Sequence, residues 1–259
     1  MKALFFDIDG TLVSFKTHQI PASTIFALTQ AKANGARVFI STGRPRSYIT
    51  NIGAIEHLID GYITTTGALC TVGDQVVSCQ PIPQEDVQHM YQLTQTDGFA
   101  CAFIGEKGNA VVNYNDELVR IFKQLLNVQT VDEVIPIEDV LRQSVLQLIP
   151  LITADEEPAV MRQLPHCVSS RWHPAFTDIT SKMADKGKGL HAICQHLHLD
   201  VSDTIAFGDG GNDIAILRQA GTSVVMGNAT DEVKQHADMV TTAVDEDGIL
   251  HALRQLKVI

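Results

Sequence analysis

Two aspartates separated by one residue stand directly after an apolar run near the start of the chain. The run extends from Ala3 to Phe6, and Asp7 and Asp9 follow it. Such a run is typical of a strand buried in a parallel sheet, and residues two apart leaving it point to the same side. Paired carboxylates can act as a nucleophile and as a general acid–base group. A single Asp before Gly10 would indicate only a turn, whereas the pair predicts a reactive site.

A second set of oxygen-bearing side chains follows another expected strand, in the segment Gly208-Asp209-Gly210-Gly211-Asn212-Asp213. The carboxylates of Asp209 and Asp213 and the amide of Asn212 offer the oxygen ligands that a hard cation prefers. Taken alone, the glycines could form only a tight turn. In a chain that also carries the first pair of aspartates, the segment predicts a metal site.

Other known motifs do not explain these residues. Asp213 stands where a dinucleotide-binding fingerprint requires its third glycine, and the chain has no Walker lysine pattern. A calcium-binding EF-hand at the first motif fails because Leu12 occupies the position that requires glycine.

Two further segments supply groups that favour an anion. Ser41-Thr42-Gly43-Arg44 follows the expected strand Val38 to Ile40 and offers a hydroxyl and backbone N–H groups. Lys186-Gly187 begins a helical stretch, where an ammonium lies beside free helix N–H groups. Either segment alone is a weak signal, but with the carboxylates they predict a site for a phosphate group and a divalent cation.

The elements that must position these residues alternate between strand and helix at both ends of the chain. Continuous apolar strands that alternate with helices favour a parallel sheet covered on both faces, so the fold class is α/β, with a Rossmann-like core. The expected strands are Ala3 to Phe6, Val38 to Ile40, Tyr62 to Ile63, Thr204 to Phe207, Ser223 to Met226 and Met239 to Thr241, and the expected helices are Pro21 to Ala33 and Asp213 to Gln219.

The middle third has a different pattern, with an expected antiparallel hairpin, Ala100 to Ile104 and Ala110 to Tyr114, around the turn 105–109. We predict an inserted α+β domain at residues 83–180, and a core domain formed by residues 1–82 and 181–259. The other expected elements of the insertion are helices at Glu85 to Gln95, Asp116 to Leu126 and Pro158 to Leu164, and strands at Val145 to Ile152, Val168 to Trp172 and Phe176 to Ile179.

Composition and charge limit the classes of partner. The formal net charge is −11, which repels nucleic acid backbones and anionic membrane surfaces, so we expect neither as a partner. No apolar stretch is long enough for a membrane span, and Asp7 interrupts the N-terminus before a signal-peptide core could form. The five cysteines contain no Cys-x-x-Cys pair, which favours free thiols in a reducing cytoplasm. We expect a cytoplasmic protein, either a monomer or a small homo-oligomer.

The whole chain resembles the haloacid dehalogenase (HAD) superfamily in the order and spacing of its four motifs. These are Asp7-x-Asp9-Gly10-Thr11, Ser41-Thr42-Gly43-Arg44, Lys186-Gly187 and Gly208-Asp209-Gly210-x-Asn212-Asp213. The insertion resembles the C2B cap of the Cof-type branch, subclass IIB, and Met226-Gly227-Asn228-Ala229 and Asp245-Glu246-Asp247-Gly248 are similar to late Cof-type segments. One departure is Thr66, since these proteins commonly have Asn-Gly-Ala where this chain has Thr66-Gly67-Ala68.

The resemblance implies a role for each acidic residue. Asp7 would attack phosphorus and form an aspartyl-phosphate, while Asp9 would protonate the leaving oxygen and then deprotonate the attacking water. Mg²⁺ would be held by Asp7, by the backbone carbonyl of Asp9 and by Asp209. Asp213 would help to hold the metal through water, or would orient Lys186.

The resemblance also implies how the transferring phosphoryl group is held. Its oxygens would contact Thr42, the N–H of Gly43, Lys186 and Asn212, with the N–H of Ile8 alongside.

The motifs and the resemblance favour a Mg²⁺-dependent phosphatase that acts on a small phosphorylated metabolite, which we expect to be a sugar phosphate. One alternative is a phosphomutase or phosphotransferase, which would use the same aspartyl-phosphate. Another is a catalytically silent protein that binds a phosphometabolite, against which the intact pair Asp7 and Asp9 counts. Trp172 and His173, late in the insertion, could line a substrate pocket, although core packing explains Trp172 equally well.

Overall fold

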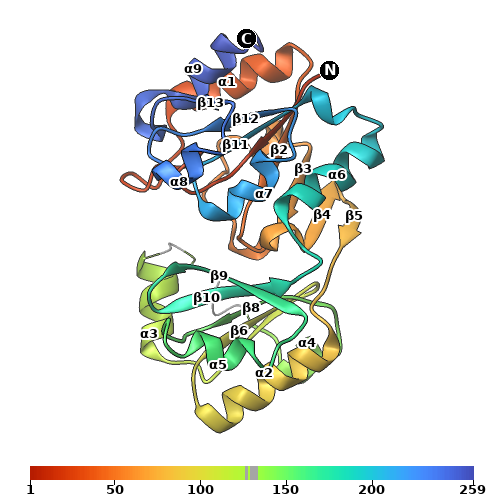
Figure 1. The fold of residues 1–259 in the computed structure, drawn as a ribbon, viewed down its shortest axis with the longest axis vertical. Coiled ribbons are helices and arrows are strands. Elements are labelled where there is room, and N and C mark those ends of the chain that lie inside the picture. The colour runs from red at the N-terminus through yellow and green to blue at the C-terminus, as the bar shows by residue number, and fades with distance from the viewer. Residues whose placement is uncertain (126–127, 129–133) are drawn as a thin grey trace. The chain divides into compact units, whose positions relative to one another are not determined.

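A computed structural model describes residues 1–125, 128 and 134–259 (Figure 1). The chain forms two compact units, each with its own sheet and its own hydrophobic core. The first unit comprises Met1–Gly43, Asn51–Cys79 and Asp185–Ile259, and the second comprises Arg44–Thr50 and Gln80–Ala184. The expected helix Asp116 to Leu126 ends at a residue outside the described part of the chain.

The first unit contains an eight-stranded sheet in the order β13-β12-β11-β1-β2-β3-β4-β5. Neighbours from β13 to β3 pair in parallel, while β4 pairs antiparallel with β3 and β5 pairs antiparallel with β4. The predicted α/β fold is therefore confirmed. The strands are β1 (Ala3–Phe6), β2 (Arg37–Ser41), β3 (Gly61–Thr64), β4 (Leu69–Val72), β5 (Gln75–Cys79), β11 (Thr204–Gly208), β12 (Thr222–Val225) and β13 (Met239–Val240).

The register of the three central strands brings their carboxyl ends to one level. Phe6 of β1 pairs with Phe207 of β11 and with Ile40 of β2. Because these strands are parallel, the chain leaves all three at the same edge of the sheet. This edge is where the motifs after each strand begin, as expected for ligand sites in open parallel sheets.

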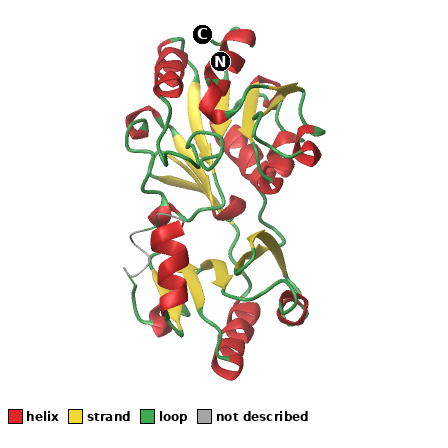
Figure 2. Cartoon of the chain, turned by 90° about the vertical axis from the view of Figure 1, so that its left-hand side faces the viewer, coloured by secondary structure: helices red, strands yellow, loops and turns green. Residues whose placement is uncertain are grey.

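Helices cover both faces of this sheet (Figures 1 and 2). Phe5 stacks on Phe39 with ring centroids 4.8 Å apart and belongs to a core shared with α6, whereas Phe6 stacks on Phe207 at 4.5 Å. Since successive strand residues point to opposite faces, these pairs fill two separate layers. The helices are α1 (Ala22–Ala33), α6 (Lys186–Leu197), α7 (Ile214–Leu217), α8 (Asp231–Lys234) and α9 (Gly248–Gln255), with 3₁₀ turns η2 (Glu56–Leu58), η3 (Thr65–Gly67), η5 (Val201–Asp203), η6 (Gly211–Asp213) and η7 (Val244–Glu246).

The second unit contains an antiparallel sheet in the order β7-β6-β8-β10-β9. The expected hairpin is present, and the α+β character predicted for the inserted region is confirmed. Its strands are β6 (Cys101–Gly105), β7 (Asn109–Val112), β8 (Val145–Pro150), β9 (Cys167–His173) and β10 (Phe176–Ser181), and its helices are α2 (Gln84–Asp97), α3 (Asp116–Val119), the π-helical η4 (Arg120–Leu125), α4 (Ile137–Val140), α5 (Glu157–Met161) and the 3₁₀ turn η1 (Arg46–Tyr48).

The second unit also includes Arg44–Thr50, which comes from the sequence between β2 and β3. The ring of Tyr48 packs edge-on against Phe122 at 5.8 Å, and the amide of Asn109 donates a hydrogen bond to the hydroxyl of Ser47 at 2.9 Å. The division predicted from the sequence placed this segment in the core domain. The domain boundaries stay a prediction, although the contacts of this segment place it in the second unit and not in the first.

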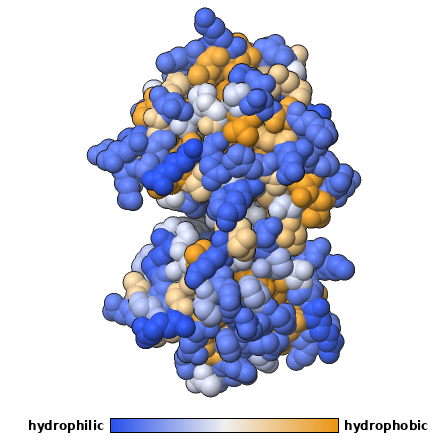
Figure 3. All heavy atoms as spheres, turned by 45° about the vertical axis from the view of Figure 1, so that its right-hand side comes forward, coloured by the Kyte–Doolittle hydropathy of each residue, from blue (hydrophilic) through white to orange (hydrophobic). Residues whose placement is uncertain are grey.

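The surface is mainly polar on the face drawn in Figure 3, where hydrophilic side chains surround separate apolar patches. Among the described helices, none is both long enough and apolar enough to span a membrane. Each of the five cysteines is a free thiol.

Candidate active site

Three carboxylates and one lysine meet at the carboxyl edge of the parallel sheet in the first unit. Asp7 follows β1, Asp209 and Asp213 follow β11, and one oxygen from each lies within 4.8 Å of the others. Lys186 begins α6, and its Nζ lies 2.8 Å from Oδ1 of Asp7 and 2.6 Å from Oδ1 of Asp213. The structure thus brings together four of the residues predicted from the sequence.

Lys186 is buried completely, so its charge depends on these two partners. Burial lowers the pKa of the Lys186 ammonium, but the charges of Asp213 and Asp7 outweigh that effect and raise the pKa overall. The ammonium therefore stays protonated at any physiological pH. Asp185, the N-cap of α6, accepts a hydrogen bond from the N–H of Lys188 at 2.7 Å, which holds the first turn in place.

One lysine does not balance three carboxylates. Burial, followed by the charge of Asp213, raises the pKa of Asp7 well above its usual value even though Lys186 opposes the change. Burial and the charge of Asp213 likewise raise the pKa of Asp209, from 3.8 to about 7. A bound cation would favour the ionised form of both groups. The donors are all oxygen atoms, and this donor set fits Mg²⁺.

Asp213 closes the turn after β11 as well as pairing with Lys186. Its Oδ2 accepts the backbone N–H groups of Asp209 at 3.0 Å and Gly210 at 2.9 Å. A Cβ at Gly208 would lie 2.5 Å from Cβ and Cγ of Asp213, so only glycine fits there. Both oxygens of Asp213 therefore have partners, and the residue orients Lys186 directly.

The loop after β1 wraps around Asp209. Gly10 has φ +86°, and a Cβ at this position would lie 2.2 Å from Oδ2 of Asp209. The hydroxyl of Thr11 donates a hydrogen bond to Oδ1 of Asp209 at 2.9 Å. Asp9 lies on this loop, is partly exposed and does not belong to the group of three carboxylates, whereas the side chain of Ile8 is fully buried.

The residues expected to hold phosphate lie on loops at the same edge. Thr42 follows β2, is almost fully buried, and donates its backbone N–H to the carbonyl of Ile63 at 2.8 Å. Gly43 follows it and is partly exposed, as is Asn212 in η6. These positions agree with the expected order of motifs, and the contacts of these residues with phosphate stay a prediction.

Asn228, for which the sequence indicates no role, lies beside the carboxylates. Its Nδ2 donates to the carbonyl of Gly10 at 2.9 Å and to Oδ2 of Asp209 at 3.2 Å. The sequence does contain one signal at this position, because Asn228 lies in Met226-Gly227-Asn228-Ala229, a segment directly after β12 that is similar to late Cof-type sequences. Nothing in that segment indicates the distant residues that it contacts.

The position where the family commonly has asparagine adopts a left-handed backbone conformation. Thr65 and Thr66 have φ +48° and +54°, which β-branched residues rarely adopt. The N–H of Thr66 donates to the carbonyl of Thr42 at 3.1 Å, so the strained turn supports a loop expected to hold phosphate. Asparagine tolerates this conformation better than threonine, which gives a physical reason for the family's preference.

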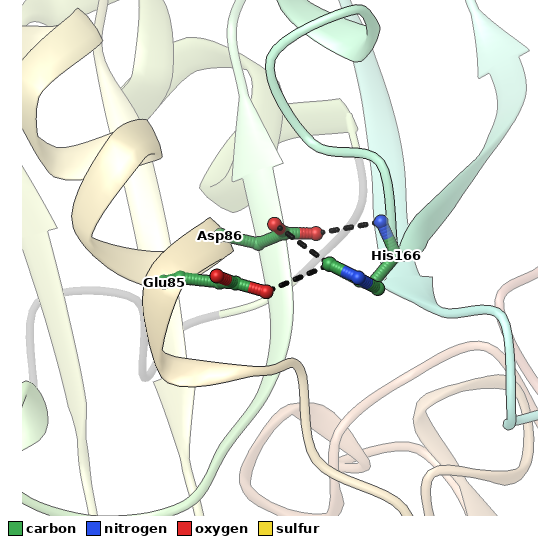
Figure 4. Close-up of side chains that lie close together, drawn as sticks. All are labelled: Glu85, Asp86 and His166. Atoms are coloured by element: carbon green, nitrogen blue, oxygen red, sulfur yellow. Dashed lines mark hydrogen bonds and ion pairs between the residues drawn. The ribbon is translucent and has the colours of Figure 1, made fainter.

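Within the described residues, another group of possible metal ligands lies in the second unit (Figure 4). Glu85 and Asp86, at the start of α2, each have a carboxylate oxygen 3.2 Å from Nδ1 of His166. Asp86 is fully buried, and its Oδ2 accepts the N–H of His166 at 2.9 Å and the thiol of Cys167 at 3.3 Å. These bonds tie α2 to the start of β9, so we assign Asp86 a structural role.

Comparison with known proteins agrees with this geometry. The family of haloacid dehalogenase-like hydrolases matches residues 4–253. YkrA of Bacillus subtilis (strain 168), provisionally named as a phosphatase, is 31% identical over 258 residues, which are 98% of this chain and 97% of that protein.

Two solved structures are more similar in sequence. The HAD subclass IIB sugar phosphatase BT4131 shares 45% identity with a TM-score of 0.91, and the match covers 100% of both chains. The HAD phosphatase BT1666 from Bacteroides thetaiotaomicron shares 35% identity with a TM-score of 0.87, over 100% of this chain and 96% of that one.

This chain shares its α/β core and its separate α+β unit with these two solved phosphatases. The chain belongs to the haloacid dehalogenase-like hydrolase family, because the family match spans nearly all of it. The resemblance to the Cof-type, subclass IIB branch and the predicted enzyme class, a phosphatase, are both confirmed.

Proposed function

We propose that this phosphatase depends on Mg²⁺ and hydrolyses a small phosphorylated metabolite, a sugar phosphate, through an aspartyl-phosphate on Asp7. The observation that supports this most strongly is the sharing of one buried ammonium, that of Lys186, between Asp7 and Asp213 at the end of the parallel sheet. The ammonium opposes the rise in the pKa of Asp7 that burial and Asp213 cause, and it holds one carboxylate oxygen in place. An ionised, oriented carboxylate is what nucleophilic catalysis requires.

In the first step, a carboxylate oxygen of Asp7 forms a bond to phosphorus while the bond from phosphorus to the ester oxygen breaks. Asp9 donates a proton to that leaving oxygen. In the second step, Asp9 takes a proton from a water molecule, which attacks the phosphoryl group and releases inorganic phosphate and Asp7. The partial exposure of Asp9 suits a group that must meet both the leaving oxygen and water.

The metal would be held by Asp7, by Asp209 and by the backbone carbonyl of Asp9, with Asp213 outside them and bound to Lys186. When bound, Mg²⁺ supplies positive charge that offsets the repulsion between the carboxylates and a phosphate dianion. Lys186, the hydroxyl of Thr42, the N–H groups of Ile8 and Gly43, and Asn212 would bind the phosphoryl oxygens.

We also propose that the second unit acts as the cap that selects the substrate. The groups proposed for phosphoryl transfer lie in the first unit, so residues of the second unit are available to contact the organic part of a substrate. In the second unit, Trp172 is 54% exposed, its ring packs on Phe176 at 4.9 Å, and its Nε1 donates to Asp178 at 3.0 Å. An exposed, rigidly held indole is suited to contact an apolar sugar face.

The test is hydrolysis of a panel of sugar phosphates by the purified protein, in Mg²⁺ and in EDTA, with ¹⁸O-labelled water. We expect activity in Mg²⁺ alone, with one labelled oxygen in each phosphate released. Activity that survives chelation contradicts the role of the metal. Isomerised or transferred product without free phosphate indicates a phosphomutase or phosphotransferase instead.

A further inference from the structure

Asn228 connects three loops that are far apart in the sequence. Its Nδ2 donates to the carbonyl of Gly10, on the loop after β1, and to Oδ2 of Asp209, on the loop after β11. Its Oδ1 accepts the N–H of Val244, the first residue of η7, at 2.9 Å. The side chain therefore fixes the distance between the two loops that carry the acidic motifs.

The partners determine which way the amide faces. Val244 offers a backbone N–H, which can only donate, while Gly10 offers a carbonyl and Asp209 a carboxylate, which accept. Only asparagine in this orientation satisfies all three at once. Aspartate would place a negative oxygen against two acceptors, and alanine would leave the carbonyl of Gly10 and Oδ2 of Asp209 without this donor.

The three carboxylates of the site are held in place by different partners. Lys186 holds Asp7 and Asp213, whereas the two oxygens of Asp209 accept from Thr11 and Asn228. Asp209 is thus held in two directions by neutral donors, which fix its position without adding a charge that would compete with a cation. Hydrogen bonds of this kind commonly tune metal affinity through the outer shell of a site.

We propose that Asn228 is a positioning residue that sets the affinity of the site for Mg²⁺ by orienting Asp209, an inference that rests on the proposed metal-dependent function. Its side chain hydrogen-bonds to Gly10, Asp209 and Val244, and it acts on the site through Asp209. Loss of its side chain weakens metal binding about 10-fold, at the lower end of the range seen when such outer partners are removed.

The test measures Mg²⁺ binding by calorimetry in wild-type protein and in Asn228→Ala, without substrate. The matched control is Asn34→Ala, since Asn34 is another exposed asparagine whose Nδ2 donates to a distant backbone carbonyl, that of Val258, at 2.8 Å. We expect the Kd for Mg²⁺ to rise in Asn228→Ala and to stay unchanged in Asn34→Ala. The Mg²⁺ concentration for half-maximal activity should rise by the same factor, while kcat at saturating Mg²⁺ falls less.

A second variant tests the same connection without removing Asn228. Val244→Pro deletes the N–H that holds Oδ1, and proline is tolerated at the first position of a helical turn. Ala243 before it, with φ −65° and ψ 164°, already has the conformation that a following proline requires. We expect a rise of about 2- to 3-fold in the Kd for Mg²⁺, below the change for complete loss of the side chain.

The outcomes separate this inference from the proposed function. If wild-type protein binds Mg²⁺ and both variants bind it equally well, the positioning role is wrong and the metal-dependent phosphatase stands. If Asn228→Ala lowers kcat at saturating Mg²⁺ with an unchanged Kd, the residue acts on the reaction and the inference is also wrong. If wild-type protein neither binds Mg²⁺ nor requires it for turnover, the proposed function itself fails.

Discussion

Replacing Asp209 with asparagine should stabilise the metal-free protein at neutral and alkaline pH, although it removes a proposed metal ligand. Burial and the neighbouring charge of Asp213 raise the pKa of Asp209 from 3.8 to about 7 in the folded state. The folded protein therefore binds this proton more tightly than the unfolded chain does. The resulting stabilisation is fully present below pH 3.8 and is lost as the pH rises through about 7.

The size of this change in the free energy of unfolding follows from the shift in the pKa of Asp209. About three units at about 1.4 kcal/mol each give a change on the order of 4 kcal/mol. Between about pH 4 and pH 8, the free energy of unfolding of Asp209→Asn should rise relative to wild type by this order of magnitude. The variant amide can direct its NH₂ group to the hydroxyl of Thr11, which can accept as well as donate, so the fold should tolerate it.

The assay is urea unfolding of both proteins across this pH range, once in EDTA and once in Mg²⁺. The control is Asp203→Asn, which changes an exposed carboxylate near Lys2. Mg²⁺ should reverse the order, because wild-type protein gains the free energy of metal binding that the variant largely loses. A stability difference in EDTA that does not change with pH would refute the reasoning, and so would an equal response of both proteins to Mg²⁺.

Three further predictions concern the site and its surroundings. Asp7→Asn should abolish turnover, while circular dichroism should show that the variant still folds. Asp9→Asn should lower kcat about 10²- to 10⁴-fold and leave Mg²⁺ binding measurable by calorimetry. Near-normal activity in either variant contradicts the mechanism. Thr66→Asn should raise the free energy of unfolding by about 1 kcal/mol in urea, because asparagine relieves strain at φ +54°; a loss of stability would show that the threonine side chain contributes more than the strain costs. Substitution of Trp172 or His173 by alanine should change kcat/KM among sugar phosphates more than turnover of a small aryl phosphate, and identical selectivity profiles would exclude this part of the second unit from substrate choice.

Much of the first unit was predictable because its strands are short apolar runs at regular intervals. The hairpin of β4 and β5 was not predicted, although Gly73-Asp74 between the strands is a turn signal. Its strands carry polar residues such as Thr71 and Ser78, and β5 is the last strand of the sheet, where side chains are exposed or only partly buried. This hairpin lacks the continuous apolar pattern that identifies the central strands.

The carboxylates and Lys186 were predictable because each follows a recognisable strand or begins a helix. Asn228 was not, since its contact with Gly10 spans 218 residues of sequence and depends on the register of separate strands. Trp172 was expected either in the core or in a pocket, and the structure leaves its ring half-exposed. Such outcomes depend on tertiary packing, which local pattern does not encode.

A fragment that contains only the inserted sequence is not the complete second unit, because Arg44–Thr50 also belongs to that unit. A fragment of residues 80–184 would lack Tyr48, which is 2% exposed and packs in a cluster with Phe122 and Phe176. An aromatic side chain missing from such a cluster typically costs about 3–5 kcal/mol, a large share of the stability of a domain this size. A peptide of residues 44–50 supplied separately, or joined by a linker to residue 80, should restore cooperative unfolding to the fragment. A simple excision of the inserted sequence should instead yield a loosely packed product.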